Sequence, residues 1–180
     1  MKQDVKMVER LLKWTDVCNK RLGQLCATLL LLMTVIGALN AVLRYIGKSM
    51  GQNLTSNAMI EIQWQLFSVS FLLGAAYVLK EDKHVRVDVL YGKLSRKRKI
   101  WIDLIGSFVF LIPFCLFGIW SSWNYVSNSW SLGEVSSAAG GLPLYPIKTL
   151  IPMSFFLLLL QGLFNALRAF LFLRGGENES

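Results

Sequence analysis

Histidine is nearly absent from this sequence, which holds only His84 among its 180 residues. Haem ligation by two histidines inside a helical bundle needs at least two of them within the membrane. A serine nucleophile needs a base beside it, and no histidine lies in an apolar segment to serve. Neither a Walker A sequence for ATP nor an HExxH zinc motif occurs. We therefore expect no enzyme activity, no catalytic residue and no cofactor.

Cysteine is also sparse. The three cysteines, Cys18, Cys26 and Cys115, have no paired spacing, and each lies in or beside an apolar segment. This pattern disfavours both a disulfide framework and a cysteine-rich metal site. We interpret all three as small buried apolar residues and expect no metal centre.

Charge is low for a chain of this length, since 17% of the residues are charged and 54% are hydrophobic. A soluble domain would usually carry more charge and would lack unbroken apolar runs near 20 residues. The net charge of +8 could suggest nucleic acid as a partner. However, the basic residues border the apolar runs, so phospholipid head groups explain the charge better. The composition predicts a membrane protein that does not bind nucleic acid.

Four apolar segments are long enough to cross a bilayer, at about 22–43, 58–79, 100–125 and 148–173. A helix of ~20 residues at ~1.5 Å per residue spans a hydrocarbon core of ~30 Å. The first segment is expected to be an uncleaved span, because no A-x-A cleavage site follows it. We expect an all-α integral membrane protein of four transmembrane helices.

The third segment carries two internal signals. Trp101 marks one end and Trp120 with Trp123 the other, as expected of two interfacial aromatic belts. Pro113 lies at its middle and should distort the helix.

An amphipathic helix is expected to precede the first span, over residues 1–21. Apolar residues recur there at helical spacing, at Val5, Val8, Leu11, Leu12 and Cys18. Lysine, arginine and acidic residues occupy the other side. Such a helix should lie along the cytoplasmic head groups. The alternative is an ordinary solvated helix packed on the loops of the protein.

The direction of the chain follows from the basic loop at 80–99, which holds eight lysines and arginines. Lysine and arginine resist translocation, so this loop should be cytoplasmic. Sixteen of the 19 basic residues then lie inside, against Arg44, Lys48 and Lys148 outside. We predict that both termini, including the tail at 174–180, are cytoplasmic.

Polar residues inside the spans are candidates for function, because they are costly against lipid tails. Glu61 and Gln65 share one face of the second span, and a proton-coupled carrier could use Glu61. However, Glu61 lies within one turn of the outer surface, and no second repeat or broken helix pair is present. We therefore favour contacts with another subunit. The full set of candidate subunit-interface residues is Asn40, Arg44, Glu61, Gln65, Gln161, Asn165 and Arg168. The alternative is that these groups satisfy each other within the bundle.

The outer connection at 126–147 holds Trp130, Glu134 and Tyr145. Aromatic anchors beside a charge are typical of protein contacts. We predict that this connection contacts another protein outside the membrane. The alternative is that Trp130 and Tyr145 only anchor the chain at the head groups.

Several of these pieces also form a recognisable order. They are Asn40-x-x-x-Arg44-Tyr45, then Glu61 with Gln63-Trp64, then LLGAAYVLKEDKHVRVDVLY at 72–91, and GGLPLYPIKTLIP at 140–152. Together they resemble the small membrane subunit, of the DctQ type, of tripartite ATP-independent periplasmic (TRAP) transporters. The likeness covers about 22–173, and DKHVRVDVLY at 82–91 is its most specific piece.

The resemblance implies a non-catalytic subunit of a bacterial inner-membrane importer. In this family a periplasmic binding protein captures an organic anion, and a large membrane subunit moves it inward with sodium ions. The small subunit packs on the large one and helps to dock the binding protein. Substrate and sodium sites belong to the large subunit, so none is expected here. The alternative function is an autonomous small proton-coupled carrier that uses Glu61.

Overall fold

The computed structural model describes residues 2–81, 94–138 and 140–175, except for the side chains of 2–16, 80, 96, 171, 174 and 175. The segment DKHVRVDVLY at 82–91 lies outside the described residues. So do most of the basic loop and the end of the C-terminal tail.

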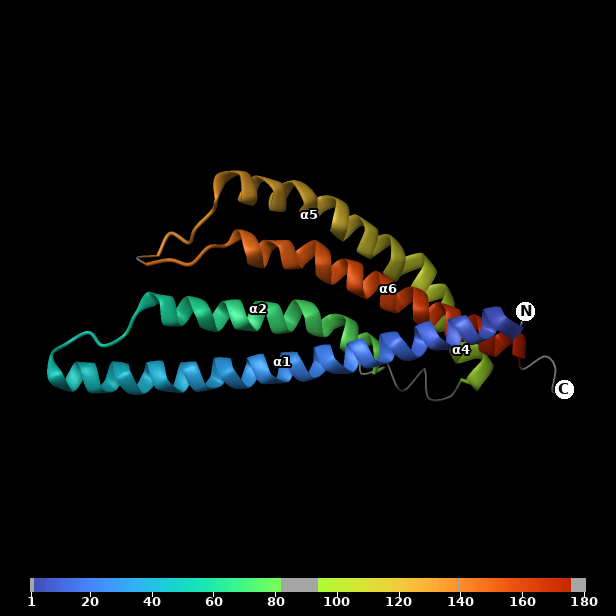
Figure 1. The fold of residues 1–180 in the computed structure, drawn as a ribbon, viewed down its shortest axis with the longest axis horizontal. Helices are drawn as coiled ribbons and strands as arrows, with labels where there is room; N and C mark the ends of the chain where they lie inside the picture. The colour runs from blue at the N-terminus through green and yellow to red at the C-terminus, as the bar shows by residue number, and fades with distance from the viewer. Residues whose placement is uncertain (1, 82–93, 139, 176–180) are drawn as a thin grey trace.

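The described chain is built from helices (Figure 1). They are α1 (Lys2–Met50), α2 (Asn57–Lys80), α4 (Arg96–Gly106), the π-helical turn η1 (Ser107–Leu111), α5 (Ile112–Leu132) and α6 (Tyr145–Gly175). Four segments are long and apolar enough to cross a membrane, namely Val17–Met50, Asn57–Leu79, Lys97–Leu132 and Tyr145–Phe170. The all-α prediction with four helices of membrane-spanning length is confirmed.

The boundary expected near residue 21 is not a helix boundary. Helix α1 continues from Lys2 to Met50 without a break, so the predicted amphipathic segment and the first span are one helix. Asn19, within the predicted interfacial segment, is buried and hydrogen-bonded to Gln161 of α6. This contact holds the end of the segment in the bundle. Whether the residues before Asn19 lie along the head groups stays a prediction.

The distortion expected at Pro113 takes a specific form. The N–H of Ile112 donates to the carbonyl of Ser107, five residues earlier, which is the hydrogen bond of a π-helical turn. Pro113, which has no N–H to donate, follows directly. The third span therefore consists of α4, η1 and α5, and it bends along its length in Figure 1.

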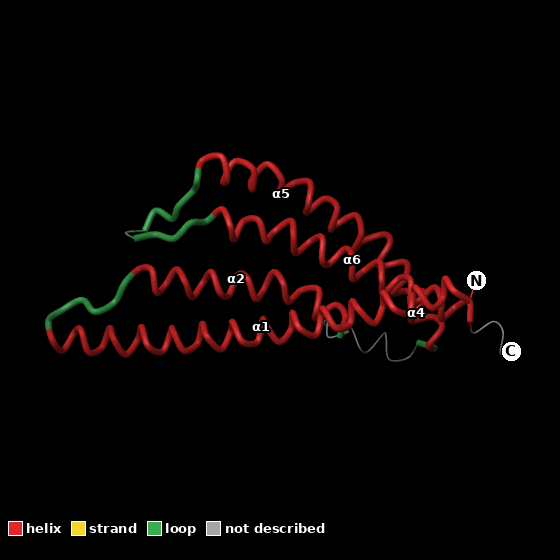
Figure 2. Tube along the Cα trace, viewed as in Figure 1, coloured by secondary structure: helices red, strands yellow, loops and turns green. Residues whose placement is uncertain are grey.

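The four spans pack in the order α1, α2, α6, α5. Two helical hairpins, α1–α2 and α5–α6, meet along α2 and α6 and diverge toward the end that carries their connecting loops. We call this the hairpin end, and its loops are the first loop (51–56) and the second loop (133–144), drawn in green in Figure 2. At the opposite end, the terminal end, the helices converge.

The buried apolar core is small. Among the described residues it consists of Cys26, Leu73, Ala76, Cys115 and Ala166. All three cysteines are free. Cys26 and Cys115 are buried, as the sequence predicted, whereas Cys18 is only partly buried. Glycine allows close helix contacts, since a Cβ at Gly118 would lie 2.8 Å from the ring of Phe155. Most apolar side chains therefore face outward, as suits a protein whose solvent is lipid.

Candidate functional site

The second loop is fastened to α2 through Glu61. Ser56 caps α2, since its hydroxyl oxygen accepts a hydrogen bond from the N–H of Ala58 at 3.2 Å, so Glu61 falls in the first turns of the helix. Glu61 is only 4% exposed, and its Oε2 accepts a hydrogen bond from the N–H of Leu142 at 2.5 Å. Gln65, one turn further, donates from Nε2 to the carbonyl of Pro143 at 3.4 Å. Both predicted interface residues therefore bind the second loop of their own chain.

The second loop has an ordered backbone of its own. Gly133 ends α5 in the left-handed region at φ 58°, where glycine has no steric penalty. Ser136 donates its N–H to the carbonyl of Leu142 at 3.0 Å, and Leu144 donates to Glu134 at 2.9 Å. A Cβ at Gly141 would lie 2.4 Å from the carbonyl oxygen of Ser136. The two sides of the loop can therefore approach this closely only because residue 141 is glycine. This close approach explains Gly141 in the Gly-Gly-Leu-Pro sequence.

Trp130 and Tyr145 lie against each other. Their ring centroids are 4.6 Å apart, and Trp130 Nε1 donates to the hydroxyl of Thr149 at 2.8 Å. Trp130 nevertheless keeps 55% of its surface exposed. The pair joins the end of α5 to the start of α6, and it leaves one large aromatic surface open.

Glu134 forms an ion pair with Lys148 of α6. The Lys148 ammonium also lies 4.0 Å from the centroid of the Tyr125 ring, a cation–π contact. The hydrogen bond from Lys148 holds the pKa of the Glu134 carboxyl below its usual range. Lys148 was predicted only as an outer basic residue, and its pairing with Glu134 was not foreseen. The charge of Glu134 is therefore largely balanced within the chain.

The polar residues of α6 meet α1 and α2 at the terminal end. Asn19 Nδ2 donates to Gln161 Oε1 at 2.6 Å, and Gln161 Nε2 donates to Asn165 Oδ1 at 2.9 Å. Asn165 Nδ2 reaches the carbonyl of Leu79 at the end of α2, at 3.5 Å. Gln161 and Asn165 thus satisfy each other within the bundle, the alternative that the sequence left open. Asn19 was missed, because it lies outside the uncharged run taken as the first span.

Arg168 lies one turn beyond Asn165. It lines a hollow of about 550 Å³ between α6, the end of α2 and the start of the third span, together with Asp103 and Asn165. Arg168 therefore lies next to the Gln161–Asn165 pair, at the end of the bundle where the helices converge.

Asn40 and Arg44 lie together at the hairpin end of α1. With Asn53 and Asn57 they line a polar hollow of about 250 Å³ beside the first loop. Arg44 is exposed, and the buried Asn40 Oδ1 has no hydrogen-bond partner within the described part of the chain. The structure therefore brings this pair together beside the first loop, away from the polar residues of α6 at the terminal end.

Comparison with known proteins assigns this arrangement to a family. Residues 33–172 match the family model described as the DctQ component of tripartite ATP-independent periplasmic transporters. The chain belongs to the DctQ family. A Haemophilus influenzae protein named as a TRAP transporter small permease is 34% identical over 125 residues, which cover 69% of this chain and 74% of that protein. The ectoine TRAP transporter small permease protein TeaB of Halomonas elongata is 26% identical over 149 residues, or 82% of this chain and 75% of TeaB.

This DctQ chain is therefore a multi-pass membrane protein and the small permease subunit of a TRAP transporter. Its candidate residues form three separate groups, at Glu61 and the second loop, at Asn40 and Arg44, and along α6. Among the residues that the structure describes, no group of three or more His, Cys, Asp or Glu side chains could hold a metal ion. Both the Glu61 group and the α6 group use their hydrogen bonds to join one helix or loop to another.

Proposed function

We propose that this DctQ chain is the scaffold subunit of a sodium-coupled importer of an organic anion. It packs along the large membrane subunit and helps to seat a periplasmic binding protein. The chain lies in the bacterial inner membrane with both termini in the cytoplasm, and it carries no catalytic chemistry of its own. The basic residues support this direction, because the starts of α1 and α4, which are rich in lysine and arginine, lie at the terminal end.

The small core carries the proposal. The spans pack in sequence as α1, α2, α6 and α5, so the two outer helices each have one long flank without a helix neighbour in the described chain. Membrane helices associate by close packing and hydrogen bonds, which an outer flank leaves unused. A layer with so small a core among its described residues favours an extension of the membrane body of a larger subunit over a solute path of its own.

The binding protein is proposed to contact the hairpin end. Helix α5 continues nine residues past Trp123, about 13 Å along its axis, so Leu132 lies beyond the aromatic belt. Three apolar side chains are exposed there: Trp130 by 55%, Leu132 by 79% and Val135 by 54%. Outside the bilayer such a cluster is typical of a protein contact. The loop beneath it is held by Glu61, Glu134 and Tyr145, so the surface is preorganised.

Uptake at limiting binding protein tests the proposal. The double substitution of Trp130 and Leu132 to Ala should raise the concentration of binding protein needed for half-maximal uptake at least about tenfold, the effect of a ~1.4 kcal/mol loss in binding. Trp120→Ala is the matched control, because Trp120 is 74% exposed but lies at the membrane belt. Unchanged uptake in the double variant would remove the docking role. Sodium-driven uptake by the large subunit and binding protein without this chain would remove the scaffold role.

A further inference from the structure

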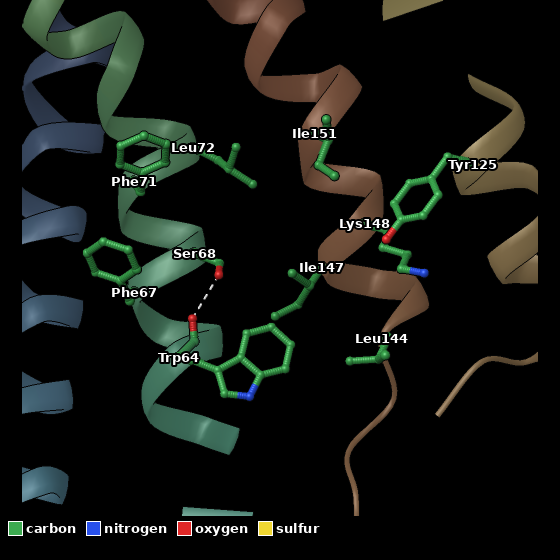
Figure 3. A pocket seen from close by; sticks show the side chains of 10 residues that line it. All are labelled: Trp64, Phe67, Ser68, Phe71, Leu72, Tyr125, Leu144, Ile147, Lys148 and Ile151. Atoms are coloured by element: carbon green, nitrogen blue, oxygen red, sulfur yellow. Dashed lines mark hydrogen bonds between the residues drawn. The ribbon is translucent and has the colours of Figure 1, made fainter. Parts of the chain in front are cut away.

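An apolar groove of about 360 Å³ runs from the hairpin end into the membrane-spanning parts of α2 and α6. Side chains of α2 line one side and side chains of α6 the other, and Tyr125 adds a contact from α5 (Figure 3). Its main lining residues are Trp64, Phe71, Leu72, Ile147, Lys148 and Ile151. The groove lies where the two helical hairpins diverge.

The hydrogen-bonding groups of the groove lie from its hairpin end, at Trp64, to its middle, at Ser68, Lys148 and Tyr125 (Figure 3). The hydroxyl of Ser68 donates to the carbonyl of Trp64 on its own helix at 2.8 Å, so it is already satisfied. Lys148 lies within one turn of the start of α6, and its ammonium is paired with Glu134. Toward Leu72 and Ile151 the lining is hydrocarbon. The occupant must therefore be apolar toward Leu72 and Ile151 and polar at the level of Lys148.

The size of the groove selects a chain over a helix. From Trp64 to Leu72 it extends eight residues along α2, about 12 Å. A helix ~10–12 Å wide could insert only one face into a groove of that length. The groove has about 360 Å³, which suits one extended hydrocarbon chain.

The ion pair of Lys148 with Glu134, beside the middle of the groove, selects the head group. Lys148 keeps 13% of its side chain exposed and Glu134 keeps 35%, so both remain reachable. A cation beside an anion complements a phosphate beside an ammonium. A primary ammonium can also donate a charge-assisted hydrogen bond to the Glu134 carboxylate, which a quaternary ammonium cannot.

We propose that this groove is a specific phospholipid site that takes one acyl chain of a phosphatidylethanolamine. The phosphate lies at Lys148 and the amine at Glu134. The site belongs to this chain alone, so it stands or falls independently of the docking role proposed above.

Lipid retention by the purified full-length chain tests the site. The chain is incubated with equal amounts of phosphatidylethanolamine, phosphatidylcholine and phosphatidylglycerol and then examined by native mass spectrometry. We expect one phosphatidylethanolamine to be retained at least about fivefold over each of the others, as one charge-assisted hydrogen bond would give. Equal retention of all three would overturn the assignment of the head group.

Two variants separate the parts of the site. Ser68→Phe fills the groove and should abolish the retained lipid. Ser121→Phe is the matched control, because Ser121 is exposed on α5 and likewise bonds only a carbonyl of its own helix, that of Gly118. Glu134→Gln should keep a lipid bound but lose the preference for ethanolamine over choline. Retention by Ser68→Phe equal to that of Ser121→Phe would overturn the groove.

A photo-crosslinker in place of Ser68 distinguishes the occupants in native membranes without relying on a bulky variant. A product with the added mass of a phospholipid supports the proposal. A product joined to another protein would show that a partner covers the groove, and the lipid site would be withdrawn.

Discussion

Glu61 and Leu142 are 81 positions apart, yet the carboxyl of the first accepts a hydrogen bond from the backbone N–H of the second. Glu61 lies in the first turns of α2, and Leu142 lies in the loop between α5 and α6. This one bond joins the two helical hairpins at the end where they otherwise diverge. Glu61, which the carrier alternative would use, thus supports a loop of its own chain.

Loss of this support should loosen the second loop. A hydrogen bond to a charged group is worth ~1.5–3 kcal/mol, so Glu61→Ala should speed exchange of the Leu142 amide hydrogen by about tenfold or more. Glu61→Gln keeps an acceptor oxygen and should show a smaller change. Hydrogen–deuterium exchange of peptides covering 140–144 is the measurement. Exchange in Glu61→Ala that matches the wild type would mean that the bond does not hold the loop.

A variant of Glu61 also distinguishes the scaffold function from the carrier alternative. Reconstituted alone, the chain should give neither substrate nor proton flux. Within the complete transporter, Glu61→Gln should reduce uptake only in part, because it weakens a support. Proton-coupled flux from the single chain, abolished by Glu61→Gln, would instead establish the carrier alternative.

Acid should release the Glu134–Lys148 pair. The pKa of Glu134 is lowered in the folded chain, so its contribution to stability is fully present above the unfolded value of ~4.3. That contribution is lost as the pH falls through the lowered folded value. Protease cleavage in the second loop should therefore increase below about pH 4 in the wild type. Glu134→Gln should be cleaved as readily at pH 7 as the wild type is in acid, and a variant that stays resistant at pH 7 would contradict this.

The Asn19–Gln161 bond should couple α1 to α6. Asn19→Ala leaves the buried Gln161 Oε1 without its donor, which costs ~1–3 kcal/mol. A double-mutant cycle with Gln161→Ala should return a coupling energy of at least about 0.5 kcal/mol in denaturant unfolding. Thr28→Ala is a suitable control, because Thr28 is exposed and bonds only the carbonyl of Gln24 in its own helix. Additive costs would show that the two residues do not act on each other.

Thiol labelling checks the direction of the chain. Ser56, Ser95 and Ser131 are all exposed, so single cysteines there, in a chain whose native cysteines are replaced, should differ only by side of the membrane. Those at Ser56 and Ser131 should react with an impermeant reagent from the periplasm, and that at Ser95 should not. Labelling of Ser95 in intact spheroplasts would reverse the predicted topology.

The sequence by itself determined the number and kind of the spans. Apolar length against a bilayer of ~30 Å leaves few alternatives, because an unpaired backbone in lipid costs several kcal/mol per group. Pro113 likewise predicted an irregular helix, because a residue without an N–H interrupts the series of backbone hydrogen bonds. The order of the motifs also indicated the family, which the comparison then showed.

Only the tertiary structure decided which polar groups meet. Helical periodicity predicts on which side of its own helix Glu61, Gln65 or Gln161 lies. It does not predict which distant segment packs against that side. Asn19 bonds Gln161 across 142 positions, and Lys148 pairs with Glu134 across a loop whose path depends on Gly133 and Gly141. A buried polar group is stable only with a hydrogen-bond partner. These pairs form because the packing of the helices brings each donor and its acceptor to the same level along the bundle. The local sequence around a residue does not predict which residues of the other helices lie at its level.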